Sequence, residues 1–152
     1  MEPKPLQQPS PPVWFGARSD GALRRAVQYG DGWMGAGSSS TGEFRVGVER
    51  VRQLLEESGR DPATFTIAKR VYIAIDEDRQ RAERRVGEWF GHLYGDAAMG
   101  PRTTIYGPTE ECSARIAEVI DAEAQHVLLN AMFDVEEHLE ALSGYVEVTH
   151  QG

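Results

Sequence analysis

The sequence is poor in cysteine, with Cys112 the single example among 152 residues. One thiol excludes a disulfide within the chain, and the lack of disulfides fits a reducing compartment. The four histidines are also scattered, at His92, His126, His138 and His150, without a ligand spacing to cysteine or carboxylates. The sequence therefore predicts no metal site.

Long hydrophobic runs are missing as well. No apolar stretch approaches the roughly 20 residues that cross a bilayer, and the N-terminus lacks the apolar segment of a signal peptide. We therefore expect a soluble, cytoplasmic protein without a membrane partner.

Basic residues are in deficit, because 16 Lys and Arg face 24 Asp and Glu and give a formal charge of −8. Nucleic acids and anionic membranes are bound chiefly through a surplus of Lys and Arg. The charge balance therefore disfavours both as partners. The length suits one domain with a core of its own but falls short of the roughly 250 residues of a closed eight-unit barrel.

Prolines are concentrated at the start of the chain. Residues 1–12 hold five of the eight prolines, which favours extended backbone with few hydrogen-bond donors. We interpret residues 1–12 as a proline-rich extended arm and residues 13–150 as the folded domain. A ligand for a proline-binding partner is the alternative interpretation of the arm.

The stretch from Val13 to Gly37 predicts a strand, a turn, a helix and a second strand. Ser19 and Asp20 suit a helix N-terminus, since their side-chain oxygens accept from free backbone N–H groups. Apolar residues then recur at helical spacing until Gly30, which suits a helix end. This is a βαβ unit and indicates an α/β protein.

The same alternation continues to the end of the chain, with a loop predicted between Gly95 and Gly107. Strands alternating with helices imply a parallel sheet with right-handed crossovers. We predict half of a (β/α)8 TIM barrel, with four parallel strands in sequential order and helices packed on one face. The strands are expected at Val13–Gly16, Gly32–Gly35, Phe65–Ile75 and His126–Asn130.

Five stretches of the sequence occur in an order that is more specific than any one of them. They are Pro3 to Ala17, Ala22 to Ala26 (Ala-Leu-Arg-Arg-Ala), Gly30 to Trp33 (Gly-Asp-Gly-Trp), Gly59 to Phe65 (Gly-Arg-Asp-Pro-Ala-Thr-Phe) and Gly107 to Cys112 (Gly-Pro-Thr-Glu-Glu-Cys). In this order they resemble the second half of the bacterial luciferase-like family, more specifically its flavin- or coenzyme F420-dependent oxidoreductases. The first half of that barrel has no counterpart in the sequence.

The resemblance implies a barrel whose FMN or coenzyme F420 lies at the C-terminal mouth. Family members use two loops of this half to hold the cofactor's phosphate through backbone N–H groups. A helix N-terminus beside the first loop favours the same anion. We expect Gly35→Asp to abolish binding without affecting the fold. The matching cofactor-binding positions are Gly16, Ala17, Arg18 and Ser19 in the first loop and Gly35, Ala36 and Gly37 in the second.

Several residues admit a plainer interpretation. Lys69 and Arg70 face opposite sides of their strand, and a structural ion pair is favoured over contact with a ligand. Cys112 is expected to pack as a small apolar side chain. Where the family commonly has glycine after the fourth helix, the chain has Glu123; left-handed backbone there costs on the order of 1 kcal/mol.

The resemblance predicts an oxidoreductase or monooxygenase half that moves hydride between the cofactor and a small organic substrate. Most groups that position the ring belong to the missing half, so no residue is assigned as catalytic and the chain alone is expected to be inactive. A partner chain that supplies the other half, or a homo-oligomer, is the expected assembly. The alternative is a non-catalytic half-barrel that serves as an interaction or phosphate-binding module, or a truncated remnant.

Overall fold

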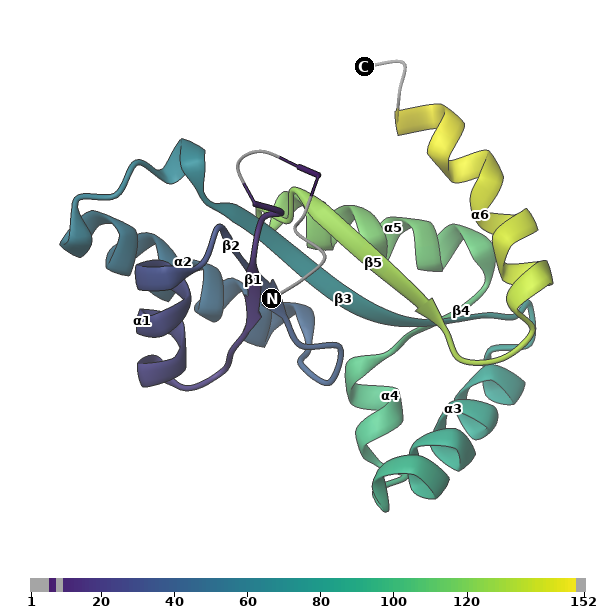
Figure 1. The fold of residues 1–152 in the computed structure, drawn as a ribbon. Coiled ribbons are helices and arrows are strands. Elements are labelled where there is room, and N and C mark those ends of the chain that lie inside the picture. Colours follow the sequence, from purple (N-terminus) through teal and green to yellow (C-terminus); the bar gives the residue numbers. More distant parts are fainter. Residues whose placement is uncertain (1–5, 8–9, 150–152) are drawn as a thin grey trace.

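The computed structural model describes residues 6–7 and 10–149 and shows one parallel sheet with helices between the strands (Figure 1). Much of the arm predicted at residues 1–12 lies outside the described residues, so that domain boundary stays a prediction. The strands are β1 (Trp14–Gly16), β2 (Gly32–Gly35), β3 (Thr66–Ile75), β4 (Ile105–Gly107) and β5 (His126–Ala131). The helices are α1 (Asp20–Tyr29), α2 (Thr41–Ser58), α3 (Arg79–Tyr94), α4 (Met99–Thr103), α5 (Thr109–Asp121) and α6 (Val135–Thr149), with a 3₁₀ turn at Pro62–Thr64.

The long strand β3 organises the sheet. It pairs in parallel with β2 along its first half and with β5 along its middle. Val127 of β5 and Gly35 of β2 both pair with Lys69, so β5 and β2 lie on opposite edges of β3. The strands β1, β2, β3 and β5 therefore follow one another in chain order. The predicted α/β fold with four parallel strands in sequential order is confirmed.

Side chains of β3 alternate between two faces, as the period of a strand requires. Ile67, Val71 and Ile73 join the main core with apolar residues of α1, α2 and α5. On the opposite face, Tyr72 and Ala74 pack with α3 and α4 in a second, smaller cluster. The prediction of helices on one face therefore holds for α1, α2 and α5, while α3 and α4 add cover at the carboxyl end of the other.

Much of this second face is uncovered in the described residues, and we call it the open face. Register assigns residues to it, because paired residues of parallel strands point the same way: Ala68 pairs with Met34 and with His126, and Arg70 pairs with Leu128. Leu128 is 49% exposed. Leu128 belongs to β5, an edge strand of the sheet, so the open face presents an exposed leucine beside an unpaired strand edge.

The prediction of a loop between Gly95 and Gly107 is wrong, because this stretch contains α4 and β4. Gly100 and Pro101 lie inside α4, where a proline in the first turn costs no hydrogen bond. Gly100 allows close packing, since a Cβ there would lie 2.8 Å from Cγ1 of Val86. The short strand β4 then pairs with the last three residues of β3, on the edge opposite to β5.

Helix ends follow the predicted chemistry only in part. Ser19 is the N-cap of α1 as predicted, but its side chain accepts no hydrogen bond from the helix backbone. Gly59 ends α2 in the left-handed conformation, at φ 66°. Glu123 has φ 68°, as expected for the position of the family's glycine, and its carboxylate accepts from Arg52 at 2.6 Å. Gly30 instead has φ −102°. Its small size matters because a Cβ there would lie 2.7 Å from the ring of Phe15.

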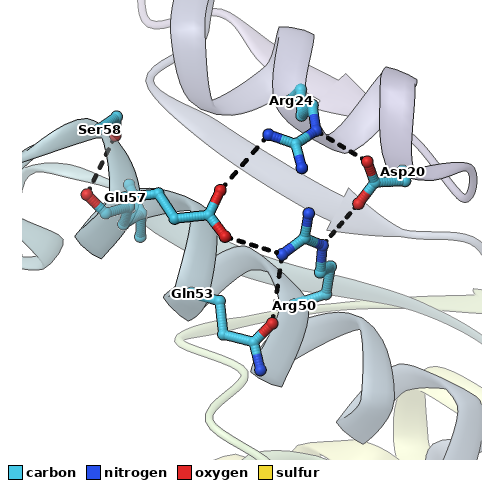
Figure 2. A network of polar contacts seen from close by, with 7 residues as sticks. Asp20, Arg24, Arg50, Gln53, Glu57 and Ser58 are labelled. Atoms are coloured by element: carbon cyan, nitrogen blue, oxygen red, sulfur yellow. Dashed lines mark hydrogen bonds and ion pairs between the residues drawn. The ribbon is translucent and has the colours of Figure 1, made fainter.

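A polar network joins α1 to α2 on the surface (Figure 2). The carboxylate of Asp20 accepts from Nε of Arg24 at 2.8 Å and from Nε of Arg50 at 2.5 Å. Arg50 also donates to Glu57 at 3.2 Å. These bonds, first from Arg50 and then from Arg24, lower the pKa of Asp20. Exposed ion pairs contribute little stability, so the network orients the two helices more than it stabilises them.

A buried histidine ties α6 to the sheet. Nε2 of His138 accepts a hydrogen bond from the backbone N–H of Ile75 at 2.8 Å. Nδ1 then carries the proton and donates to the carbonyl of Asp134 at 2.7 Å. His138 is 2% exposed, so its replacement by an apolar residue leaves the N–H of Ile75 without an acceptor. We expect His138→Leu to lower the free energy of unfolding by about 1–3 kcal/mol, measured by urea denaturation.

The exposed His92 offers the control for this substitution. His92→Leu should change the free energy of unfolding by less than about 0.5 kcal/mol. Equal losses in the two variants would show that the bond to Ile75 contributes nothing to folding.

Candidate functional site

The two loops predicted to hold a cofactor meet at one edge of the sheet. Gly16, the last residue of β1, pairs with Met34 in β2, so the following loops begin at neighbouring levels. A guanidinium N–H of Arg18 donates to Oγ of Ser38 at 2.8 Å and bridges the loops. The indole N–H of Trp33 donates to the carbonyl of Ala17 at 2.9 Å. The structure thus brings the predicted residues together, and their binding role stays a prediction.

These residues border two adjoining cavities that share Ala36. The larger cavity has a volume of about 300 Å³ and lies on the open face of the sheet. The smaller cavity has a volume of about 200 Å³. The larger is lined by Trp14, Gly16, Met34, Gly35, Ala36 and Arg70. The smaller includes Ala17, Arg18, Ala36, Ser39 and Glu43 together with core residues of α1, β2 and α2.

The predicted glycines play different parts. A Cβ built on Gly16 meets nothing within 4 Å, so this position is open toward the cavity. A Cβ on Gly35 would lie 2.6 Å from Cδ2 of Phe44, in the core. The expectation that Gly35→Asp spares the fold is therefore wrong, because overpacking of a filled core is destabilising. A Cβ on Gly37 would lie 2.8 Å from Nε of Arg70.

Lys69 holds the second loop from beneath. Its ammonium donates to the carbonyl of Ser39 at 2.9 Å, to Oγ of Ser39 at 3.1 Å and to the carbonyl of Ala36. It is 2% exposed and is one of two lysines in the sequence. Burial, together with the charges of Arg18 and Arg70, lowers the pKa of Lys69 to about 8.

Arg70 points to the open face, opposite to Lys69. Its guanidinium donates to the hydroxyl of Tyr72 at 3.1 Å, and that hydroxyl lies 2.8 Å from the hydroxyl of Tyr94. Nε of Arg70 is buried and has no hydrogen-bond partner among the described residues. The favoured ion-pair interpretation is wrong for both basic residues, since neither forms a salt bridge within the described part of the chain.

Glu43 occupies the start of α2. Its carboxylate accepts from the backbone N–H of Ser40 at 2.7 Å, while Oγ of Ser40 accepts from the N–H of Glu43 at 3.2 Å. This capping box already satisfies donors of the helix N-terminus. The bonds from Ser40 lower the pKa of Glu43, so the smaller cavity contains a carboxylate that is ionised at neutral pH.

Other reactive groups lie away from both cavities. Cys112 is 1% exposed and packs in the main core as predicted, and burial raises the pKa of its thiol to about 11. A thiol of that pKa is a poor nucleophile at neutral pH. Within residues 6–7 and 10–149, no group of three or more His, Cys, Asp or Glu is arranged to hold a metal ion. In the same residues, no helix combines the length and hydropathy needed to cross a bilayer.

Arg70, and Lys69 as support for the loop, are the site residues that sequence reasoning undervalued. The signal was two basic residues at the middle of a strand otherwise rich in buried apolar side chains. A charge in such a strand needs partners. Lys69 finds them in backbone carbonyls of another loop and Arg70 in the hydroxyl of Tyr72, and sequence alone does not reveal the first of these.

The family model of luciferase-like monooxygenases matches residues 1–101. Similar solved structures include an F420-dependent secondary alcohol dehydrogenase in complex with an F420-acetone adduct (TM-score 0.69, 16% identity, 82% of this chain and 44% of that chain). Others are a coenzyme F420 dependent tetrahydromethanopterin reductase from Methanopyrus kandleri (0.68, 18%, 86% and 48%) and EDTA monooxygenase (EmoA) from Chelativorans sp. BNC1 (0.69, 16%, 95% and 46%). A search of curated protein sequences gave no match. The chain spans less than half the length of these three structures.

Proposed function

Because this chain belongs to the luciferase-like monooxygenase family, we propose that it is the C-terminal half of a flavin- or deazaflavin-dependent oxidoreductase. Its part is to hold the phosphate of FMN or coenzyme F420 between the loop at Gly16–Ser19 and the loop at Gly35–Ser38. The bound cofactor would supply hydride transfer to or from a small organic substrate. Most groups that position the cofactor ring are expected from the other half of the barrel, so we assign no catalytic residue to this half.

One observation carries the proposal: Arg18 and Ser38 bridge the two loops, and the glycines at which these loops begin, Gly16 and Gly35, line a cavity that Gly16 leaves open. Backbone N–H groups approach a phosphate closely only where side chains are small. A cavity of about 300 Å³ falls at the lower end of the volumes typical of ligand pockets. It has room for the phosphate and the adjoining chain, while the ring extends toward the open face.

The open face supports the second part of the proposal, a missing half-barrel. Similar structures are about twice as long as this chain, and a closed barrel covers the sheet face that is exposed here. We propose that a partner chain or a second copy covers it. A cytoplasmic location fits this assignment, since the lone Cys112 is a buried free thiol.

Gly16 offers a direct test, since a side chain there meets no neighbouring atom within 4 Å. Gly16→Asp places a carboxylate in the cavity, and its repulsion should weaken FMN or F420 binding by about tenfold or more. The measurement is a titration of the full chain with each cofactor, followed by the shift of the cofactor's visible absorbance.

Gly16→Asn is the matched control, because it has the same shape without the charge. The Asn variant should bind each cofactor with an affinity within about threefold of the wild type, since an uncharged amide does not repel phosphate. Equal affinities of the Asp and Asn variants would place the phosphate elsewhere. A wild-type chain that binds neither cofactor would favour the alternative, a half-barrel that serves only as an interaction module.

A further inference from the structure

The two cavities beside Ala36 differ in charge. The smaller is lined by Arg18 but also by the ionised carboxylate of Glu43. In the larger, Arg70 is the one charged residue among the described lining residues. A carboxylate repels a phosphate, whereas an unopposed guanidinium attracts it. An anion at these loops is therefore favoured in the larger cavity, on the open-face side.

The register of the sheet places Arg70 close to the points at which the two loops begin. Gly16 pairs with Met34, and Gly35 of the same strand pairs with Lys69. Arg70 is thus one residue beyond the level at which β2 ends and the second loop begins. Its alternation with Lys69 turns its side chain to the open face, where it lines the larger cavity with Gly16 and Gly35.

The guanidinium of Arg70 is positioned by Tyr72, but only part of its hydrogen-bonding capacity is used within the described chain. Of its five N–H donors, one bonds to the hydroxyl of Tyr72, and the guanidinium lies over the Tyr72 ring, 5.1 Å from the centroid. Nε is buried against Gly37, without a hydrogen-bond partner in the described chain.

We propose that Arg70 binds the cofactor's phosphate from the open-face side of the sheet, in the cavity that it shares with Gly16 and Gly35. This inference rests on the proposed function, which supplies the phosphate. The backbone N–H groups of the two loops then approach the phosphate from one side and the guanidinium from the other. Tyr72, bonded in turn to Tyr94, acts as a positioning residue that fixes the guanidinium.

The test compares FMN with riboflavin, which lacks only the phosphate. We expect the wild-type chain to bind FMN at least about tenfold more tightly than riboflavin, and Arg70→Met to remove that preference while leaving riboflavin affinity within about twofold. The measurement is fluorescence titration of the full-length chain. Arg25→Met, on the exposed face of α1, is the control and should retain the preference.

Each outcome bears on a different claim. Arg70→Met with an unchanged preference for FMN overturns the role of Arg70 and leaves the proposed function standing. A wild-type chain without preference for FMN overturns the proposed phosphate site and this inference with it. Should Arg70→Met fail to fold, Arg70→Gln carries the same test, because it keeps a polar side chain and removes the charge.

Discussion

Replacing Lys69 by methionine is expected to abolish a rise of stability between about pH 8 and pH 10.5. The wild-type ammonium is buried under the second loop, and burial lowers its pKa to about 8 in the folded chain, against about 10.4 for an exposed lysine. Below pH 8 both states hold the proton, and above pH 10.5 neither does. Between these limits the unfolded chain binds more protons at Lys69, so the contribution of Lys69 to wild-type stability increases with pH.

The size of this effect follows from the same shift. The free energy of unfolding of the wild type, minus that of Lys69→Met, should increase by up to about 1.4 kcal/mol for each pH unit in this window. Urea unfolding at intervals of half a pH unit measures it, and the difference between the two proteins cancels the titration of Cys112 and of the tyrosines, which both proteins share. A difference that stays flat from pH 7 to pH 10 would show that Lys69 keeps an ordinary pKa and is not confined under the loop.

The second large effect concerns the open face. We expect the wild-type chain at micromolar concentration to have about twice the mass of a single chain in light scattering. Leu128 is 49% exposed on the open face, and its strand β5 is an edge strand that pairs with β3 alone among the described strands. Exposed apolar surface and an unpaired strand edge both promote association. A second copy covers them through a two-fold contact.

Leu128→Gln should shift the chain toward monomer and weaken self-association by about tenfold, because it places an amide in an apolar contact. Val46→Gln is the matched control. Val46 is 65% exposed on the outer side of α2, away from the open face, and its replacement should leave the mass unchanged. A monomeric wild type that fails to bind a hydrophobic dye would mean that one chain covers this face, and the half-barrel interpretation would be abandoned.

The order of elements was predictable because each long helix carries a clear apolar stripe between turn residues. Phe44, Val48 and Val51 of α2 are examples, and all three are buried. The segment α4–β4 was not predictable for a physical reason. Its helix contains Gly100 and Pro101 and its strand has three residues, so neither is long enough to display a period.

The site was predictable in place but not in detail. Residues at the ends of β1 and β2 converge because parallel strands end at one edge of a sheet, and Arg18 and Ser38 do meet. Sequence could not show that Gly35 abuts Phe44 while Gly16 faces open space. Nor could it assign partners to Lys69 and Arg70, since a strand's alternation gives the side of a residue but not what lies there.

The central claim is that the two loops after β1 and β2 hold a phosphate. The most direct measurement is the change of backbone amide signals in ¹H–¹⁵N NMR spectra when FMN, and separately riboflavin, is added to the full chain. The account predicts that FMN shifts the amides of residues 16–19 and 35–38 and that riboflavin leaves them in place. Equal shifts with both ligands, or FMN-specific shifts confined to other residues, would contradict it.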